Sequence, residues 1–330
     1  MVIFSMNKLL KKIVKVIFPL FLGAFILYWV YRDFDFSRVE GLLLHEMEWG
    51  WMVLSLVAGV MSHLLRGWRW CLTLEPLGEQ PRRSTAADAI FISYAGSLLL
   101  PRVGEVTRCG VLARYDGVPF ARSLGTVVTE RLVDMLCMAL ITGVTFVLQM
   151  PLFMRFFNET GIKIPSLLHL VTSPWFYVAL CCVGGVVVLL CYLVRMLSFF
   201  ERVKGIALDV WKGVLSLRKL RHVWLFVAYT LGIWFCYYLH FYLTFFCFGF
   251  TAGLSMLAGL VMFVGGTFAV LVPTPNGAGP WHFAVITMMM LYGVSAADAS
   301  LFALVVHAVQ TLLVVLLGVA GWMHLQWRRR

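Results

Sequence analysis

Two stretches of this sequence place charged side chains inside apolar runs, where a charge is costly and usually functional. The first stretch, residues 96–116, also interrupts a helix, because proline removes a backbone donor and glycine weakens helical structure. Its proline, glycine and charged residues are Pro101, Arg102, Gly104, Glu105 and Arg108. Guanidinium groups beside a helix break suit the binding of a phosphate or a carboxylate.

The second stretch lies inside a long apolar run, residues 120–149, and contains Glu130, Arg131 and Asp134. At 1.5 Å per residue, Arg131 lies roughly 17 Å into this run, near the middle of a bilayer. Glu130 and Asp134 are four residues apart and share one face of a helix. Two interpretations stay open: a site for an anionic headgroup, or buried pairs, Arg131 with Glu130 or Asp134 and Arg102 or Arg108 with Glu105, that only hold helices together.

A third stretch, VPTPNGAGPWHF at residues 272–283, breaks another apolar run. Pro280 suits the first position of a helix. We therefore expect one helix to start near Gly279–Pro280, and another near Gly104–Glu105 in the first stretch. Helix N-termini present free N–H groups and a partial positive charge, so both starts should attract anions.

The composition requires a membrane. Of 330 residues, 61% are hydrophobic and only 13% are charged, which excludes an ordinary soluble domain. We predict an all-α polytopic membrane protein in which residues 1–330 form a single integral membrane domain. Six spanning helices are expected near Ile13–Tyr31, Trp49–Leu65, Phe120–Gln149, Trp175–Leu197, Val223–Phe248 and Ala296–Trp322.

The net charge of +11 follows from topology and does not indicate a nucleic-acid partner. Lysine and arginine gather before the first predicted span, after the second and fourth, and at the end of the chain. The positive-inside rule makes these segments cytoplasmic, so both termini should face the cytoplasm of a prokaryote across its inner membrane. For Arg66 and Arg69, at the end of the second span, we favour anchoring at the interface over contact with lipid phosphate.

Two segments are expected to enter the membrane without crossing it. If residues 86–116 crossed, the arginines after Pro101 would lie outside, against the charge bias, and the segment is also short for a span. It should instead form a re-entrant hairpin from the cytoplasmic side. Residues 254–292 should form a second hairpin from the opposite face, because the last helix must end in the cytoplasm.

The order of the elements repeats with inverted topology. The halves, about residues 1–150 and 174–330, each read helix, helix, hairpin, helix, and His307 matches Arg131 in position after its hairpin. Transporters use such repeats to place a site at the membrane midplane. The candidate substrate-binding residues are therefore Arg102, Gly104, Glu105, Arg108, Glu130, Arg131, Asp134, Pro275, Asn276, Gly277, Gly279, Trp281, His282 and His307. For the two histidines a buried, backbone-bonded role is an equal alternative, and for the tryptophan packing is favoured.

Four motifs carry a resemblance to a known family: LLRGWRW, LLLPRVGEVTR, VVTERLVDM, and VPTPNGAGPWHF followed by YGVSAADA. From about Lys15 to Trp322 the sequence resembles the lysylphosphatidylglycerol synthase transmembrane-region family. The resemblance implies a lipid flippase, since a similar region of the multiple peptide resistance factor moves aminoacylated phosphatidylglycerol outward. At an acidic position of the family's last motif, this sequence has Trp281 or His282.

Three functions stay open. The first is a flippase for an anionic phospholipid or a polyprenyl-phosphate-linked lipid, with the phosphate held by Arg102, Arg108 and Arg131. The second is an intramembrane phosphatase or transferase, for which Glu105 and His282 would be the acid–base pair; no HExxH or GxSxG motif supports it. The third is a non-transporting membrane partner of a separate synthase or glycosyltransferase. No motif predicts a cofactor, metal or nucleotide.

Overall fold

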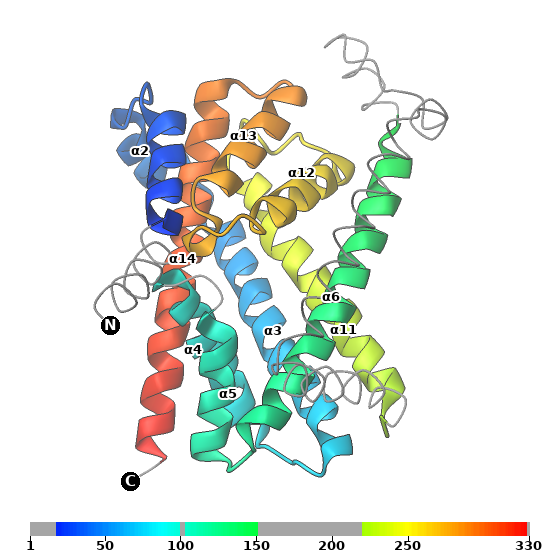
Figure 1. Ribbon diagram of the computed structural model, residues 1–330. Coiled ribbons are helices and arrows are strands. Elements are labelled where there is room, and N and C mark those ends of the chain that lie inside the picture. Colours follow the sequence, from blue (N-terminus) through cyan, green and yellow to red (C-terminus); the bar gives the residue numbers. More distant parts are fainter. Residues whose placement is uncertain (1–17, 100–102, 151–219, 329–330) are drawn as a thin grey trace, which may run out of the picture.

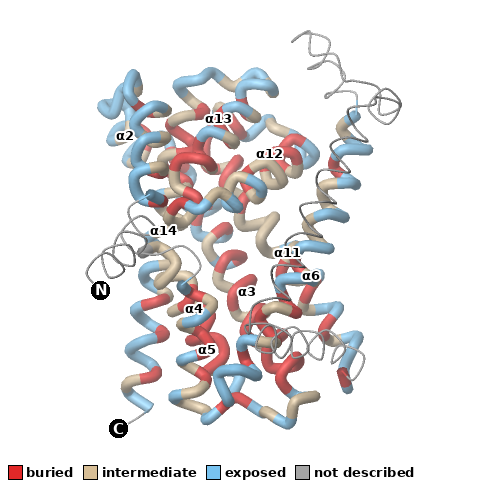
Figure 2. The backbone as a smooth tube through the Cα atoms, viewed as in Figure 1, coloured by how far each residue is buried: buried red, intermediate tan, exposed pale blue. Residues whose placement is uncertain are grey.

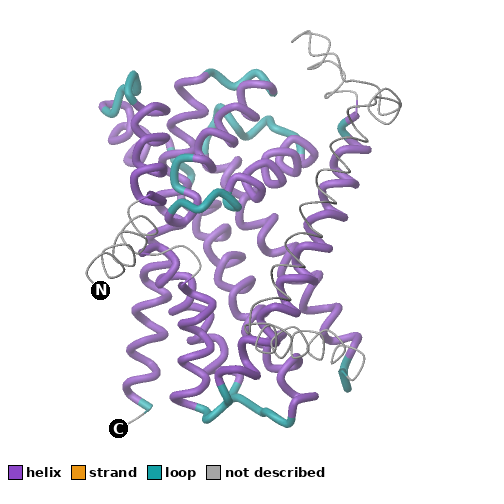
Figure 3. Tube along the Cα trace, viewed as in Figure 1, coloured by secondary structure: helices purple, strands orange, loops and turns teal. Residues whose placement is uncertain are grey.

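The computed structural model describes residues 18–99, 103–150 and 220–328, and within these ranges the chain is helical without a strand (Figure 3). The predicted span Trp175–Leu197 lies outside the described residues, as do Pro101 and Arg102. The helices are Phe18–Tyr31, α2 (Ser37–Gly41), η1 (Leu42–Glu46), α3 (Trp49–Leu74), η2 (Glu75–Leu77), α4 (Arg83–Leu99), α5 (Val103–Tyr115), α6 (Phe120–Leu148), α11 (Val223–Tyr242), η4 (Leu243–Cys247), α12 (Met256–Ala269), η5 (Pro275–Gly277), α13 (Pro280–Leu291) and α14 (Ala296–Trp327).

Within the described ranges, four helices are long and apolar enough to cross a membrane: Trp49–Leu77, Phe120–Leu148, Val223–Cys247 and Ala296–Trp327. They correspond to four of the six predicted spans. The predicted end of the second span at Leu65 is wrong, because the helix continues past Arg66 and Arg69. Both arginines are buried in ion pairs, which removes the reason for placing them in the headgroup region.

Two pairs of shorter helices pack among the long ones (Figure 1). The pair α4–α5 lies in the half of the molecule where α14 ends, and the pair α12–α13 lies in the half where α14 begins. The two pairs cover the segments for which hairpins were predicted. The short turn η5, which joins α12 to α13, contacts α4, so the second pair touches the first.

Close approach at glycines lets α4 pack tightly against its neighbours. A methyl group added at Gly104 of α5 would overlap the backbone carbonyl oxygen of Ser93, and one at Gly318 of α14 would overlap Ala95. On α3, an added carbon at Gly67 would lie 2.9 Å from the Ala87 backbone. Small residues of this kind let membrane helices approach closely, and they hold α5 against α4.

Buried residues form two large packed regions and one small cluster of Leu72, Leu220 and Phe226 (Figure 2). One region is an aromatic core of α11, η4, α13 and α14 that includes Phe241, Phe245 and Phe302. The other packs α3, α4 and α5 around Trp70 and Ile90. The half of α6 beyond these regions is exposed, which suits a surface that faces lipid.

Substituting Gly104 by alanine tests the close packing of the first helical pair. We expect Gly104→Ala to lower the stability by about 1–3 kcal/mol, because the added methyl group has no room against backbone atoms. Gly110, further along α5, has nothing within 4 Å of an added carbon and is the matched control. Thermal unfolding in detergent should show a lower midpoint for Gly104→Ala and an unchanged or higher midpoint for Gly110→Ala. Equal midpoints would contradict this packing.

Candidate anion-binding site

Five charged side chains from three helices meet inside the bundle. Helix α3 supplies Arg66 and Arg69, α5 supplies Arg108, and α6 supplies Glu130 and Asp134. All five side chains are at most 10% exposed, and those of Arg69 and Glu130 have no exposed surface. Each of these buried charges needs a partner of opposite charge within the protein, because an unpaired buried charge is strongly destabilising.

Asp134 joins α6 to α3 through both of its oxygens. Its Oδ2 accepts a hydrogen bond of 2.9 Å from Arg66 Nη1, and its Oδ1 accepts one of 2.8 Å from Arg69 Nη2. Arg66 Nε also donates to the Tyr237 hydroxyl at 3.1 Å, and that hydroxyl lies 2.8 Å from the hydroxyl of Tyr94. Asp134 is therefore well satisfied and fixes two helices relative to one another.

Glu130 is less completely bonded than Asp134. Its Oε2 accepts a hydrogen bond of 2.9 Å from Arg108 Nη1, whereas its Oε1 lies 3.4 Å from Arg69 Nε and has no hydrogen-bond partner. Arg108 Nε and Nη2 and Arg69 Nε are also buried without a partner. The Arg108 guanidinium lies over the ring of Trp70, 4.7 Å from its centre. Arg69, Arg108 and Glu130 therefore keep donors and an acceptor that form no hydrogen bond within the protein.

A fourth arginine lies nearer the surface. Arg131 Nε donates to Glu105 Oε1 at 2.7 Å, and the two side chains are 46% and 34% exposed. The sequence had suggested that Arg131 pairs with a carboxylate of its own helix and that Arg108 pairs with Glu105. In the structure Arg131 pairs with Glu105, and Arg108 pairs with Glu130. Successive helical residues are rotated by about 100°, so Glu130 faces inward and its neighbour faces outward.

The expectation that Arg66 and Arg69 anchor the helix at the interface is wrong. They are three residues apart on α3, and the carboxylates of α6 are four apart, so each set lies on one helical face. The two faces carry opposite charges and pair with each other. This complementary spacing is the sequence signal that identifies both arginines as members of the site.

A second polar group surrounds the turn η5. Asn276 has a left-handed backbone (φ 52°), and its side-chain amide donates to Thr311 Oγ1 at 2.8 Å. With its hydrogen on Nε2, His307 donates to the Asn276 carbonyl at 3.2 Å and accepts from Thr311 at 3.4 Å. These bonds hold the turn after Pro275 against α14. Gly277 also has a positive φ of 71°.

The start of α13 is the predicted one, at Pro280, and α5 begins at Val103, beside the predicted Gly104. The Gly279 N–H donates to His282 Nδ1 at 3.3 Å. The rings of His282 and His307 lie 4.5 Å apart between centres, and the ring of Trp281 lies 5.2 Å from that of His307.

The described candidate residues therefore form two groups. Arg108, Glu130 and Asp134 belong to the buried charged group that they form with Arg66 and Arg69. Glu105 and Arg131 form the half-exposed pair beside that group, and Gly104 lies next to it on α5. The group at the other hairpin consists of Pro275, Asn276, Gly277, Gly279, Trp281, His282 and His307. Contact between η5 and α4 connects the helical pair that carries Glu105 and Arg108 with the pair that carries Trp281 and His282.

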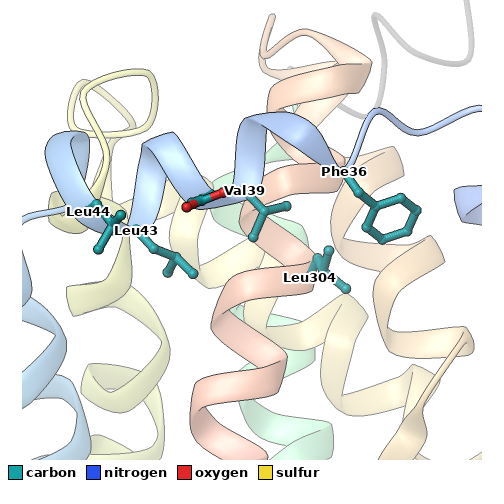
Figure 4. A pocket seen from close by; sticks show the side chains of 6 residues that line it. Phe36, Val39, Leu43, Leu44 and Leu304 are labelled. Carbon is teal, nitrogen blue, oxygen red and sulfur yellow. The ribbon is translucent and has the colours of Figure 1, made fainter.

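A shallow hollow between α2, η1 and α14 lies away from both groups (Figure 4). Its lining has a single charged side chain, that of Glu40. The lining residues are Phe36, Val39, Glu40, Leu43, Leu44 and Leu304. Since apolar side chains predominate, this surface has no means of holding a phosphate.

The fold and the site define a helical multi-pass membrane protein with an ion-paired centre buried among its long helices. The chain belongs to the family described as Lysylphosphatidylglycerol synthase TM region, whose model matches residues 16–318. It is also similar to Glycosyltransferase AglD of Haloferax volcanii, with 34% identity over 89 residues. That similarity covers 27% of this chain and only 14% of the relative's length. No solved structure matches the chain.

Replacing Asp134 tests whether its double pairing stabilises the fold. We expect Asp134→Ala to cost about 3–5 kcal/mol, because two buried guanidinium groups lose their main acceptor. The matched change Glu105→Ala removes the partner of half-exposed Arg131 and should cost less than about 1 kcal/mol. Thermal unfolding of both purified variants in one detergent measures the difference. A similar loss for both would contradict the distinction between the buried and the exposed pair.

Proposed function

We propose that this protein is a lipid flippase that moves an anionic phospholipid or a polyprenyl-phosphate-linked lipid across the inner membrane. The observation that carries the proposal is the buried charged group, in which Arg66, Arg69 and Arg108 outnumber Glu130 and Asp134. Arginine within a membrane protein is costly and suits an anionic substrate. The phosphate of a lipid headgroup is an anion that the membrane itself provides.

In this proposal, α4–α5 and α12–α13 are re-entrant hairpins within an inverted repeat of six spans. Their helices have 17, 13, 14 and 12 residues, all below the roughly 20 residues that cross a membrane. Their positions in opposite halves of the molecule support entry from opposite faces (Figure 1). The distribution of lysine and arginine supports cytoplasmic termini.

The half-exposed pair of Arg131 and Glu105 is the proposed entrance for the headgroup. A phosphate can compete with the Glu105 carboxylate for Arg131 and then reach Arg108, one helical turn from Glu105 on α5. From there the headgroup passes the midplane between the hairpins, where η5 meets α4. Rocking of the two halves then opens the site to the other side.

The match to a glycosyltransferase motivates a second candidate, a membrane partner that presents lipid-linked substrate to a separate synthase or glycosyltransferase. Co-purification with such an enzyme, together with no lipid movement by the chain alone, would favour it. An intramembrane enzyme has less support, because its only candidate pair is divided: Glu105 bonds Arg131, whereas His282 lies against His307.

Transport by Arg131→Ala in liposomes tests the flippase proposal. We expect the purified protein to move labelled anionic lipids between leaflets, and Arg131→Ala to slow this at least about tenfold, since one lost charge contact is worth roughly 1.4 kcal/mol or more. Arg38→Ala is the matched control, because Arg38 also forms an exposed ion pair, with Asp298 at 3.0 Å near the start of α14. Unchanged movement by a folded Arg131→Ala variant would exclude Arg131 from the mechanism.

A further inference from the structure

We infer that the charged group selects a headgroup with a single negative charge, a phosphate diester, and that Arg108 binds its two free oxygens. The inference rests on the proposed function and narrows its substrate class. Phospholipids with an alcohol esterified to the phosphate, such as phosphatidylglycerol, share this diester chemistry with polyprenyl-phosphate sugars. A phosphate monoester, with close to two charges above pH 7, is the class that the site should reject.

The buried charges of the group do not balance. Among the described residues, three buried guanidinium groups (Arg66, Arg69 and Arg108) face two buried carboxylates (Glu130 and Asp134), which leaves one positive charge in excess. The neighbouring pair of Arg131 and Glu105 adds one charge of each sign and changes nothing. Unbalanced charge is costly where water is excluded, so an anion of one charge is the best match.

Arg108 has donors that form no hydrogen bond within the protein. Arg108 uses Nη1 for Glu130, and the remaining donors Nε and Nη2 lie together along one edge of the planar guanidinium. Both are buried without a partner, and Arg108 is only 2% exposed. This edge is a fork that binds two oxygens of a carboxylate or phosphate side by side. A diester offers two such oxygens.

Arg108 makes fewer bonds between helices than the other two buried arginines of the group. Arg66 and Arg69 both bond Asp134, and each also donates to a hydroxyl, of Tyr237 or Thr230. Arg108 bonds only Glu130 and lies on the ring of Trp70, while its Nε and Nη2 are buried without a hydrogen-bond partner. Arg108 is therefore the arginine that can accept a substrate without releasing a bond between helices.

Binding measurements in a neutral detergent test this selectivity without any transport. The probes are phosphatidylglycerol and a polyprenyl-phosphate hexose, both diesters, and phosphatidic acid, a monoester, each at pH 8. We expect at least one diester to bind about tenfold more tightly than phosphatidic acid, and the stronger diester identifies the lipid class. Equal or tighter binding of phosphatidic acid by the unaltered protein would overturn the inference.

Substitutions at Glu130 and Arg108 test the charge balance and the guanidinium donors of the site. Glu130→Gln raises the excess to two charges, so the preference should shift at least tenfold toward phosphatidic acid. Arg108→Gln should lose the affinity for every probe, while Asp298→Asn, at a distant exposed ion pair, should leave the preference unchanged. Glu130→Asp keeps the charge with a shorter side chain and should keep the diester preference, which separates charge from packing.

The outcomes separate this inference from the flippase proposal. A folded Glu130→Gln variant that retains the diester preference would overturn the charge-matching inference, even if the protein moves lipids in liposomes. Conversely, the expected selectivity in detergent without lipid movement in liposomes would sustain the inference about the site and count against transport by the chain alone.

Discussion

The pairing of buried arginines with two carboxylates of α6 is the constraint on which this structure depends. No solvent stabilises a charge inside a bilayer, so each guanidinium requires an acceptor from another helix. Asp134 meets this need for both Arg66 and Arg69, and it fixes the position of α6 along α3. Glu130 pairs with Arg108 and thereby holds α5 against α6 beside the same group of charges. Three helices are aligned by charge rather than by apolar packing alone.

Close backbone packing makes the approach of α5 possible. Gly104 lies against Ser93 of α4, and α4 in turn packs on Gly67 of α3 and Gly318 of α14. Larger side chains at these positions would move α5 outward, and Arg108 would then lose contact with Glu130. In this way small residues, which make no polar contacts through side chains, determine whether the charges can meet.

Sequence reasoning predicted the elements better than their contacts. Hydropathy and turn residues predicted four described spans and the start of α13 at Pro280, because length and helix-breaking chemistry are local properties. The partner of each charge is not local, since it depends on the rotation and depth of a second helix. Arg131 was therefore considered with its neighbours on α6 although it bonds Glu105. Arg66 was assigned to the interface because arginines at the end of an apolar run usually lie there.

The contrast between the two carboxylates separates structural from functional roles. Replacing a buried ion pair by apolar residues is often neutral or stabilising, so packing alone does not require five buried charges. Asp134 has its oxygens fully engaged, as expected of a group that joins helices. Glu130 and Arg108 leave a carboxylate oxygen and two guanidinium donors unbonded inside the protein. Incomplete bonding of buried groups raises the free energy of the folded protein, and an anionic ligand at Arg108 would lower it.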